Sequence, residues 1–201
     1  MAAPDREQSG IGAALTLHHP VYARPVPPSA YLNEVSEHTD PISAHIVEGT
    51  PGDSCILGLE QLIGKVDLVV SGINTGSNLG WDVLVSGTVG AALQGYVRGY
   101  PTIAISVGSV LNPQFEVAAK FLQLTASKLD KESTPDLFFL NVNVPSVALD
   151  QINGVQVTRL SGRSYSESVR SEGTGHQQHY WISRNRPVHK DNSEGTDACA
   201  L

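Results

Sequence analysis

The sequence predicts an α/β protein with a Rossmann-like three-layer core, a mostly parallel sheet, and a loop- and hairpin-rich C-terminal extension. Two features of the 201-residue chain support this fold class. Short apolar runs of strand length alternate with segments of helical periodicity, and residues 66–106 follow a complete strand–loop–helix–strand pattern. Because open α/β sheets bind ligands at the carboxyl ends of their strands, the polar loop inside this segment is the first candidate site.

The central segment begins with an apolar run at 66–70, which is long enough for a buried strand and too short for a helix. A second apolar run at 102–106 predicts a parallel neighbour of that strand. Between the two runs, apolar residues recur at helical spacing and predict a helix with one apolar face. This face is formed by Val89, Ala92, Leu93, Tyr96 and Tyr100. Pro101 ends this helix, since proline cannot continue one.

The rest of the chain supplies the remaining elements. Further helices are predicted from Thr50-Pro51 onward, where proline suits the first turn, and over 113–129. Short apolar runs predict strands at 13–17, 21–26, 44–48, 137–144, 154–160 and 179–183. The Ser-, Gly- and Arg-rich stretch 161–178 indicates a mobile loop or an extending arm. We therefore expect an α/β core over 1–160 and an irregular arm over 161–201 that serves oligomerisation.

Ser86-Gly87-Thr88 lies where the central helix is predicted to begin. The first N–H groups of a helix have no partners within the helix, and the helix dipole is positive there. Two hydroxyls and a glycine leave room for a phosphate to approach these groups. The commoner arrangement, in which Ser86 or Thr88 serves only as an N-cap, stays open at this point.

Composition narrows the class of protein. The formal net charge of −7 argues against a general nucleic-acid-binding surface and hence against a duplex partner. It leaves a nucleotide substrate open, because a metal ion and helix ends can carry the anion. Cys55 and Cys199 lie too far apart in sequence to suggest a disulfide framework. No segment resembles a signal peptide or an 18-residue apolar span, so we expect a cytoplasmic protein with no membrane partner.

Residues 71–95, SGINTGSNLGWDVLVSGTVGAALQG, resemble the central signature of the SurE (survival protein E) family of nucleotidases. Nearly every position of the pattern SGIN-x-G-x-N-x-G-x-D-x-x-x-SGTV is matched. APDREQSG at 3–10, GTPGDSC at 49–55 and LNVNVP at 140–145 are similar to further segments of that family, in the family's order. The resemblance covers essentially the whole chain.

The resemblance implies a metal-dependent phosphomonoesterase that hydrolyses nucleoside 5′-monophosphates, with 3′-monophosphates as a second substrate class. The implied cofactor is Mg²⁺ or Mn²⁺, held by the hydroxyl of Ser9 and the side-chain oxygen of Asn74. The implied phosphate-binding residues are Ser86, Gly87 and Thr88. Four further signature residues are expected to support the loop: Gly72, Gly76, Asn78 and Asp82. A homodimer or a higher homo-oligomer is also expected.

One family motif is absent. Members of the family begin with an apolar strand that ends in Asn-Asp-Asp-Gly, whose two aspartates are metal ligands, and this motif does not occur here. We therefore expect a chain truncated at both ends, with little or no activity of its own. The competing hypothesis is a non-catalytic nucleotide- or phosphate-binding fragment, or one that only forms oligomers. A dinucleotide-binding domain is a weaker alternative, because no G-x-G-x-x-G turn follows a first strand.

Overall fold

The computed structural model describes residues 1–30, 43–129, 135–162, 165–173, 178–187 and 193–201. The chain divides into two compact units. Unit 1 comprises residues 1–78 and 84–152, and unit 2 comprises residues 79–83 and 153–201.

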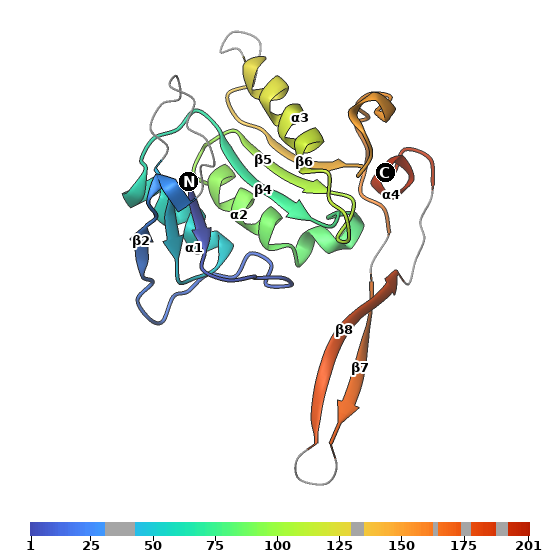
Figure 1. Cartoon of the computed structure of the whole chain (residues 1–201), viewed down its shortest axis with the longest axis horizontal. Helices are drawn as coiled ribbons and strands as arrows, with labels where there is room; N and C mark the ends of the chain where they lie inside the picture. Colours follow the sequence, from blue (N-terminus) through green and yellow to red (C-terminus); the bar gives the residue numbers. More distant parts are fainter. Residues whose placement is uncertain (31–42, 130–134, 163–164, 174–177, 188–192) are drawn as a thin grey trace. The chain divides into compact units, whose positions relative to one another are not determined.

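Unit 1 is built on three parallel strands, which follow one another across the sheet in the order β4 (Val69–Thr75), β5 (Thr102–Val107) and β6 (Phe139–Val144) (Figure 1). Residues 69 and 70 pair with 102 and 103, so the predicted parallel pairing of the two apolar runs is confirmed. The predicted bounds of the first strand are wrong. β4 begins at residue 69 and includes half of the expected loop, because Asn74 and Thr75 still pair with β5.

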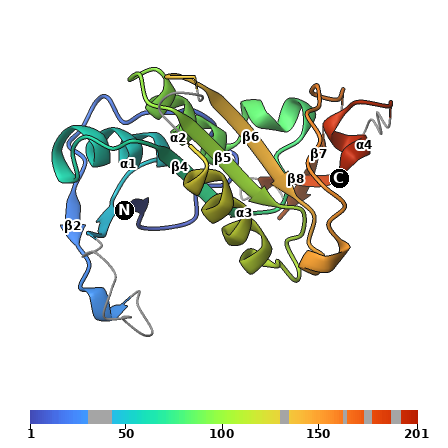
Figure 2. The ribbon, with the colours of Figure 1, turned by 90° about the horizontal axis from the view of Figure 1, so that it is seen from above.

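The sheet lies between two helices, α2 (Gly87–Tyr96) and α3 (Phe115–Ser127), which confirms the predicted three-layer core (Figure 2). All six residues of β5 are buried, and its side chains alternate between the two faces. On one face, the side chains of β5 form a hydrophobic cluster with α3 that includes Ile103, Ile105, Val107, Val117 and Ala118. On the other face, a Cβ added to Gly95 of α2 would lie 3.1 Å from the hydroxyl oxygen of Thr102.

The buried face of α2 consists of small residues, so the predicted apolar face is correct at Ala92 and wrong at Leu93. The buried positions are Gly90, Ala91, Ala92 and Gly95, whereas Leu93 is exposed. Small residues let the helix backbone approach its neighbours closely. Helical spacing of large apolar residues could not reveal this contact, because the contacting residues have almost no side chain.

A second sheet of unit 1 has the order β1 (Ala2–Pro4), β3 (His45–Val47) and β2 (Ala23–Pro25). β1 runs parallel to β3, and β2 runs antiparallel to it. The predicted strand at 44–48 is confirmed as β3, and the one at 21–26 shortens to β2. The strand predicted at 13–17 is wrong, because backbone groups of this segment bond to the start of the next helix instead.

That helix, α1 (Pro51–Leu57), begins at the predicted signal. The hydroxyl of Thr50 accepts a hydrogen bond from the N–H of Asp53 at 3.0 Å, and the Asp53 carboxylate accepts one from the N–H of Thr50 at 2.9 Å. This reciprocal pair is a capping box. The same carboxylate also accepts from the N–H of Thr16 at 3.0 Å, so it ties the preceding segment to the helix. A single π-turn, Gly58–Leu62, extends α1.

Unit 2 contains an antiparallel hairpin of β7 (Tyr165–Glu172) and β8 (His179–Pro187), and the short helix α4 (Asp197–Ala200). The strand predicted at 179–183 is confirmed within β8, but much of 161–178, expected to be a loop or arm, is strand β7. The strand predicted at 154–160 is wrong, because only Arg159 makes a bridge, to Thr196. Three short 3₁₀ turns complete the described chain: Pro28–Ala30, Gly80–Leu84 and Leu149–Gln151.

The capping box yields a stability prediction. Burial raises the pKa of Asp53, but hydrogen bonds from Thr16 and Thr50 outweigh this effect and lower the pKa below its ordinary value of 3.8. Asp53→Asn removes the charged acceptor, so we expect the free energy of unfolding to fall by about 1–2 kcal/mol at pH 7. The stabilisation by a carboxylate with a lowered pKa is fully present above the unfolded-state pKa and is lost as the pH falls through the folded-state pKa.

Urea unfolding between pH 7 and pH 3 measures this effect. The difference between the variant and the wild type should shrink in acid, and the exposed Asp67→Asn serves as the control. A difference that stays constant over this pH range would contradict the assigned role of the Asp53 carboxylate.

Candidate functional site

The start of α2 carries the groups that could hold an anion. Ser86 is the N-cap, and its buried hydroxyl accepts a hydrogen bond from the N–H of Val89 at 3.2 Å. The interpretation of Ser86 as an N-cap is therefore correct, and its oxygen is already engaged as an acceptor. Within the described chain, the N–H groups of Gly87 and Thr88 have no hydrogen-bond acceptor. These two groups, with the Thr88 hydroxyl, can therefore point to an anionic ligand.

The turn that contains Ser9 packs against this helix start. The N–H of Gly12 donates to the carbonyl of Val85 at 2.9 Å. A Cβ added to Gly87 would lie 3.3 Å from the carbonyl oxygen of Gln8, and a Cβ added to Gly90 would overlap the carbonyl oxygen of Gly12. Residues 8–12 therefore lie along the first turn of α2.

Ser9 itself is exposed within this turn, and its hydroxyl donates to the carboxylate of Glu7 at 2.6 Å. The structure thus brings one predicted metal ligand and the predicted phosphate-binding residues to the same part of unit 1.

Asn74 lies near the carboxyl end of β4, beside Ser106 of β5. Its side-chain nitrogen donates to the backbone carbonyl of Thr75 at 3.0 Å and to that of Gly76 at 2.7 Å. Because both partners are oxygens, the nitrogen must face them, and the side-chain oxygen is left to accept other bonds. An amide oxygen is a suitable ligand for a hard divalent cation.

The direction of α2 places its start near this edge of the sheet. A Cβ on Gly95, in the last turn of α2, would lie 2.9 Å from Val69 at the amino end of β4. The helix returns from the carboxyl edge towards the amino ends of the strands, so its first turn faces the same edge as Asn74. The convergence of Asn74 with Ser9 in a single cleft stays a prediction.

The loop-support residues have different surroundings. A Cβ on Gly72 would overlap the carbonyl oxygen of Ile105, so this strand position excludes a side chain. Gly76 has a φ of +87°, and its N–H donates to the carbonyl of Ser109 at 3.2 Å. Asn78 is buried in unit 1. Within unit 2, Asp82 is buried.

In unit 2, Asp197 holds residues 79–83, which belong to the family signature. One of its carboxylate oxygens accepts from the N–H of Gly80 at 2.8 Å, and the other accepts from the N–H of Ser161 at 2.9 Å. Asp197 is buried, so these charge-assisted bonds hold residues 79–83 to the C-terminal part of the unit. Nothing in the sequence pattern had singled out this residue.

No role was expected for Asn141 and Asn143, which lie in the family-like segment at 140–145. Their side chains bind the backbone of Asn78. Two asparagines at alternate positions of an otherwise apolar strand are the signal that could have revealed them, because buried amides require partners.

Two observations limit the available chemistry. Burial raises the pKa of the Cys55 thiol to about 11, against the opposing effect of Arg98, so the thiol is protonated at neutral pH and is no nucleophile. Among the described residues, no group of three or more His, Cys, Asp or Glu side chains could hold a metal ion.

No helix in the described part of the chain is both long and apolar enough to cross a membrane.

The fold and these groups define a class: a Rossmann-like α/β protein whose strand ends and helix start can receive an anionic ligand. Comparison with known proteins agrees. The family model described as "Survival protein SurE" matches residues 1–167. The chain therefore belongs to the SurE family.

Several relatives support this assignment. The 5′-nucleotidase SurE of Petrotoga mobilis is 38% identical over an alignment 201 residues long, gaps included. The alignment covers 98% of this chain and 75% of that protein. The 5′-nucleotidase SurE of Gloeobacter violaceus is 43% identical over 182 residues, which cover 90% of this chain and 66% of that protein. The crystal structure of the SurE protein from Aquifex aeolicus superimposes with a TM-score of 0.74 at 36% identity, covering 98% of this chain and 75% of that one. The chain is thus an enzyme of the nucleotidase class by resemblance.

Proposed function

We propose that the chain binds the phosphate of a nucleoside 5′-monophosphate at the start of α2 and takes part in hydrolysing the phosphate ester. Nucleoside 3′-monophosphates are the second substrate class, and the cytoplasm is the proposed compartment. One observation carries the proposal: Gly87 and Thr88 present unbonded N–H groups within the signature of a family whose relatives are named 5′-nucleotidases. A phosphate oxygen would accept from these groups and would be favoured by the helix dipole.

The residues fit a divalent cation only in part. Ser9 and Asn74 would supply oxygen ligands to Mg²⁺ or Mn²⁺, and such an ion would offer charge neutralisation and activation of water. The described residues contain no acidic cluster, however, and two neutral oxygens hold Mg²⁺ weakly because it gives up its water shell reluctantly. No catalytic step through a metal ion is derived from this donor set, and we expect slow turnover by this chain.

The lack of an acidic cluster among the residues that the structure describes also favours a second candidate, a non-catalytic phosphate- or nucleotide-binding protein. The two candidates share the anion site at α2 and differ in whether the bound ester is cleaved.

A combined experiment separates them. Binding of nucleoside 5′- and 3′-monophosphates is measured by calorimetry, and phosphate release is measured with and without added Mn²⁺. Mn²⁺-dependent phosphate release supports the nucleotidase, and binding without release supports the second candidate. Absence of binding would contradict both.

Gly87→Ala tests the anion site. The new Cβ would lie 3.0 Å from Pro51 and 3.3 Å from the carbonyl oxygen of Gln8, so the first turn of α2 or the 8–12 turn must shift. We expect the Kd for a nucleoside 5′-monophosphate to rise about 10-fold, or ~1.4 kcal/mol. Gly58→Ala is the control, because its Cβ would make only ordinary contacts with Ala2 and Ile63. Equal affinities of the two variants would contradict the proposed site.

Asn74→Ala tests the proposed cation ligand. The side-chain oxygen is lost while the start of α2 stays intact, so turnover that depends on Mn²⁺ should fall much more than nucleotide binding. Steady-state kinetics and calorimetry on the same preparation give both quantities. Equal losses in both would show that Asn74 only positions the loop.

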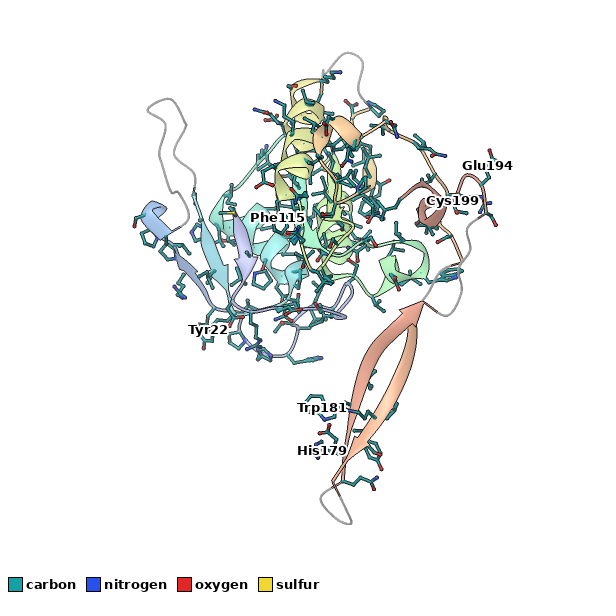
Figure 3. The ribbon with its side chains drawn as sticks, turned by 45° about the vertical axis from the view of Figure 1, so that its right-hand side comes forward. Tyr22, Phe115, His179, Trp181, Glu194 and Cys199 are labelled. Carbon is teal, nitrogen blue, oxygen red and sulfur yellow. The ribbon has the colours of Figure 1, made fainter. Side chains whose placement is uncertain are left out.

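We also propose that the hairpin of unit 2 mediates homo-oligomerisation. Exposed apolar side chains gather on it: Val169, Tyr180, Trp181 and Ile182. Val169 and Ile182 are cross-strand partners and therefore share one face. On the opposite face, Figure 3 shows His179 and Trp181, whose rings pack edge to face with their centroids 6.1 Å apart. An isolated two-stranded hairpin is only marginally stable in water. We therefore propose that a second copy of the chain covers the face formed by Val169 and Ile182.

Ile182→Lys tests this contact. The side chain is 76% exposed, so a lysine fits the single chain but would place a charge in an apolar interface. Light scattering after size exclusion should show the wild type as a dimer or larger and the variant shifted to monomer. Leu111→Lys in unit 1, at a residue 95% exposed, is the control. A monomeric wild type would overturn the proposal.

A further inference from the structure

The side-chain amides of Asn141 and Asn143 in β6 hold Asn78, which lies in the loop that follows β4. Asn143 accepts from the backbone N–H of Asn78 at 2.8 Å and donates to its backbone carbonyl at 3.1 Å. Asn141 donates to the same carbonyl at 2.9 Å. The two side chains thus occupy both backbone groups of Asn78, much as a neighbouring strand would.

The side chain of Asn78 makes a further contact with the sheet. Its nitrogen donates to the hydroxyl of Ser106 at 2.8 Å, and Ser106 is fully buried in β5. Asn78 itself is only 9% exposed. Three side chains on two strands therefore hold this residue, and the bond to Ser106 is the one that is buried away from water.

The orientation of the gripping amides is set by their partner. The oxygen of Asn141 is buried and has no hydrogen-bond partner in the described chain. Flipping the amide would place this oxygen against the carbonyl oxygen of Asn78. The donor of Asn141 therefore faces the carbonyl of Asn78.

The residues that hold Asn78 are aligned across the sheet with Asn74, the proposed cation ligand. Across the sheet, Asn74 pairs with Ser106, and Ser106 pairs with Asn143. Side chains of paired residues in neighbouring strands share one face, so these three form a polar row near the carboxyl edge. Asn78 lies over the Ser106–Asn143 part of this row.

The loop that joins Asn74 to Asn78 is short and is held by hydrogen bonds at both ends. Asn74 holds its amide nitrogen on the carbonyls of Thr75 and Gly76. Gly76 is tied to Ser109, and Asn78 is tied to β6. Residues 75–78 therefore have little freedom to move those carbonyls.

We propose that Asn143, assisted by Asn141, is a positioning residue for Asn74. Through Asn78 it fixes the carbonyls of Thr75 and Gly76, and these hold the Asn74 amide with its oxygen free. The inference rests on the proposed function for the purpose of that oxygen, and its geometry stands on the hydrogen bonds alone. Loss of such supporting contacts around a metal ligand typically lowers metal affinity or activity by about 10- to 100-fold.

The test follows the Asn74 side chain directly. ¹H–¹⁵N spectra of the wild-type chain, Asn143→Ala and Asn143→Asp are compared. Asn143→Asp keeps the size and the acceptor but loses the donor, so it serves if the alanine variant does not fold. The control is Asn112→Ala, which changes an exposed asparagine of the same unit.

We expect the backbone amide of Asn78 to exchange at least about 10-fold faster in Asn143→Ala than in the wild type. The side-chain NH₂ signals of Asn74 should move towards the positions of a solvent-exposed asparagine in both Asn143 variants and stay unchanged in Asn112→Ala. Unchanged Asn74 signals in the folded Asn143 variants would overturn the proposal, whatever happens at Asn78.

Addition of Mn²⁺ separates this result from the proposed function. The paramagnetic ion should broaden the Asn74 NH₂ signals in the wild type and broaden them less in the Asn143 variants. If Mn²⁺ broadens no Asn74 signal in the wild type, the cation site of the proposed function fails, and the shift of the Asn74 signals in metal-free protein still decides whether Asn143 positions this side chain.

Discussion

The two-sided bond between the Asn143 side chain and the backbone of Asn78 is the constraint on which the candidate site depends. A loop after a parallel strand must satisfy its own backbone groups when it folds back over the sheet. Here an amide of β6 satisfies them, and the loop is thereby held to β6 and to its fully buried neighbour β5. The polar strand edge is therefore tied to the sheet by side-chain hydrogen bonds from both strands.

Close packing of small residues provides the second constraint. The turn at 8–12 lies against α2 only because Gly12, Gly87 and Gly90 have no side chains at the contact. This contact places Ser9 beside the helix start, although the two are far apart in sequence. Beside this contact, the N–H groups of Gly87 and Thr88 have no partner among the described residues, which is the property that an anion site needs.

The fold class, the parallel pairing of β4 with β5 and the helix starts at Thr50 and Ser86 could be predicted from the sequence, because each has a local signal. Strand bounds were less predictable: β4 continues through Gly72 and Asn74, since pairing with β5 overrides the turn preference of these residues. The segment at 13–17 has a strand pattern, yet its backbone serves the cap of α1. The grip on Asn78 joins residues about 65 positions apart, a relation that spacing within one segment cannot express.

The family assignment supports the proposal that the helix start receives a phosphate, and the chemistry of the two proposed cation ligands makes catalysis by this chain a separate question from binding. In the proposed site, the Gly87 and Thr88 amides receive a phosphate without any metal ion, whereas the two proposed cation ligands, Ser9 and Asn74, supply neutral oxygens. The most direct measurement is a ¹H–¹⁵N titration of the chain with a nucleoside 5′-monophosphate. The account predicts that the backbone amides of Gly87 and Thr88 show the largest shifts; shifts confined to the hairpin of unit 2, with Gly87 and Thr88 unchanged, would contradict it.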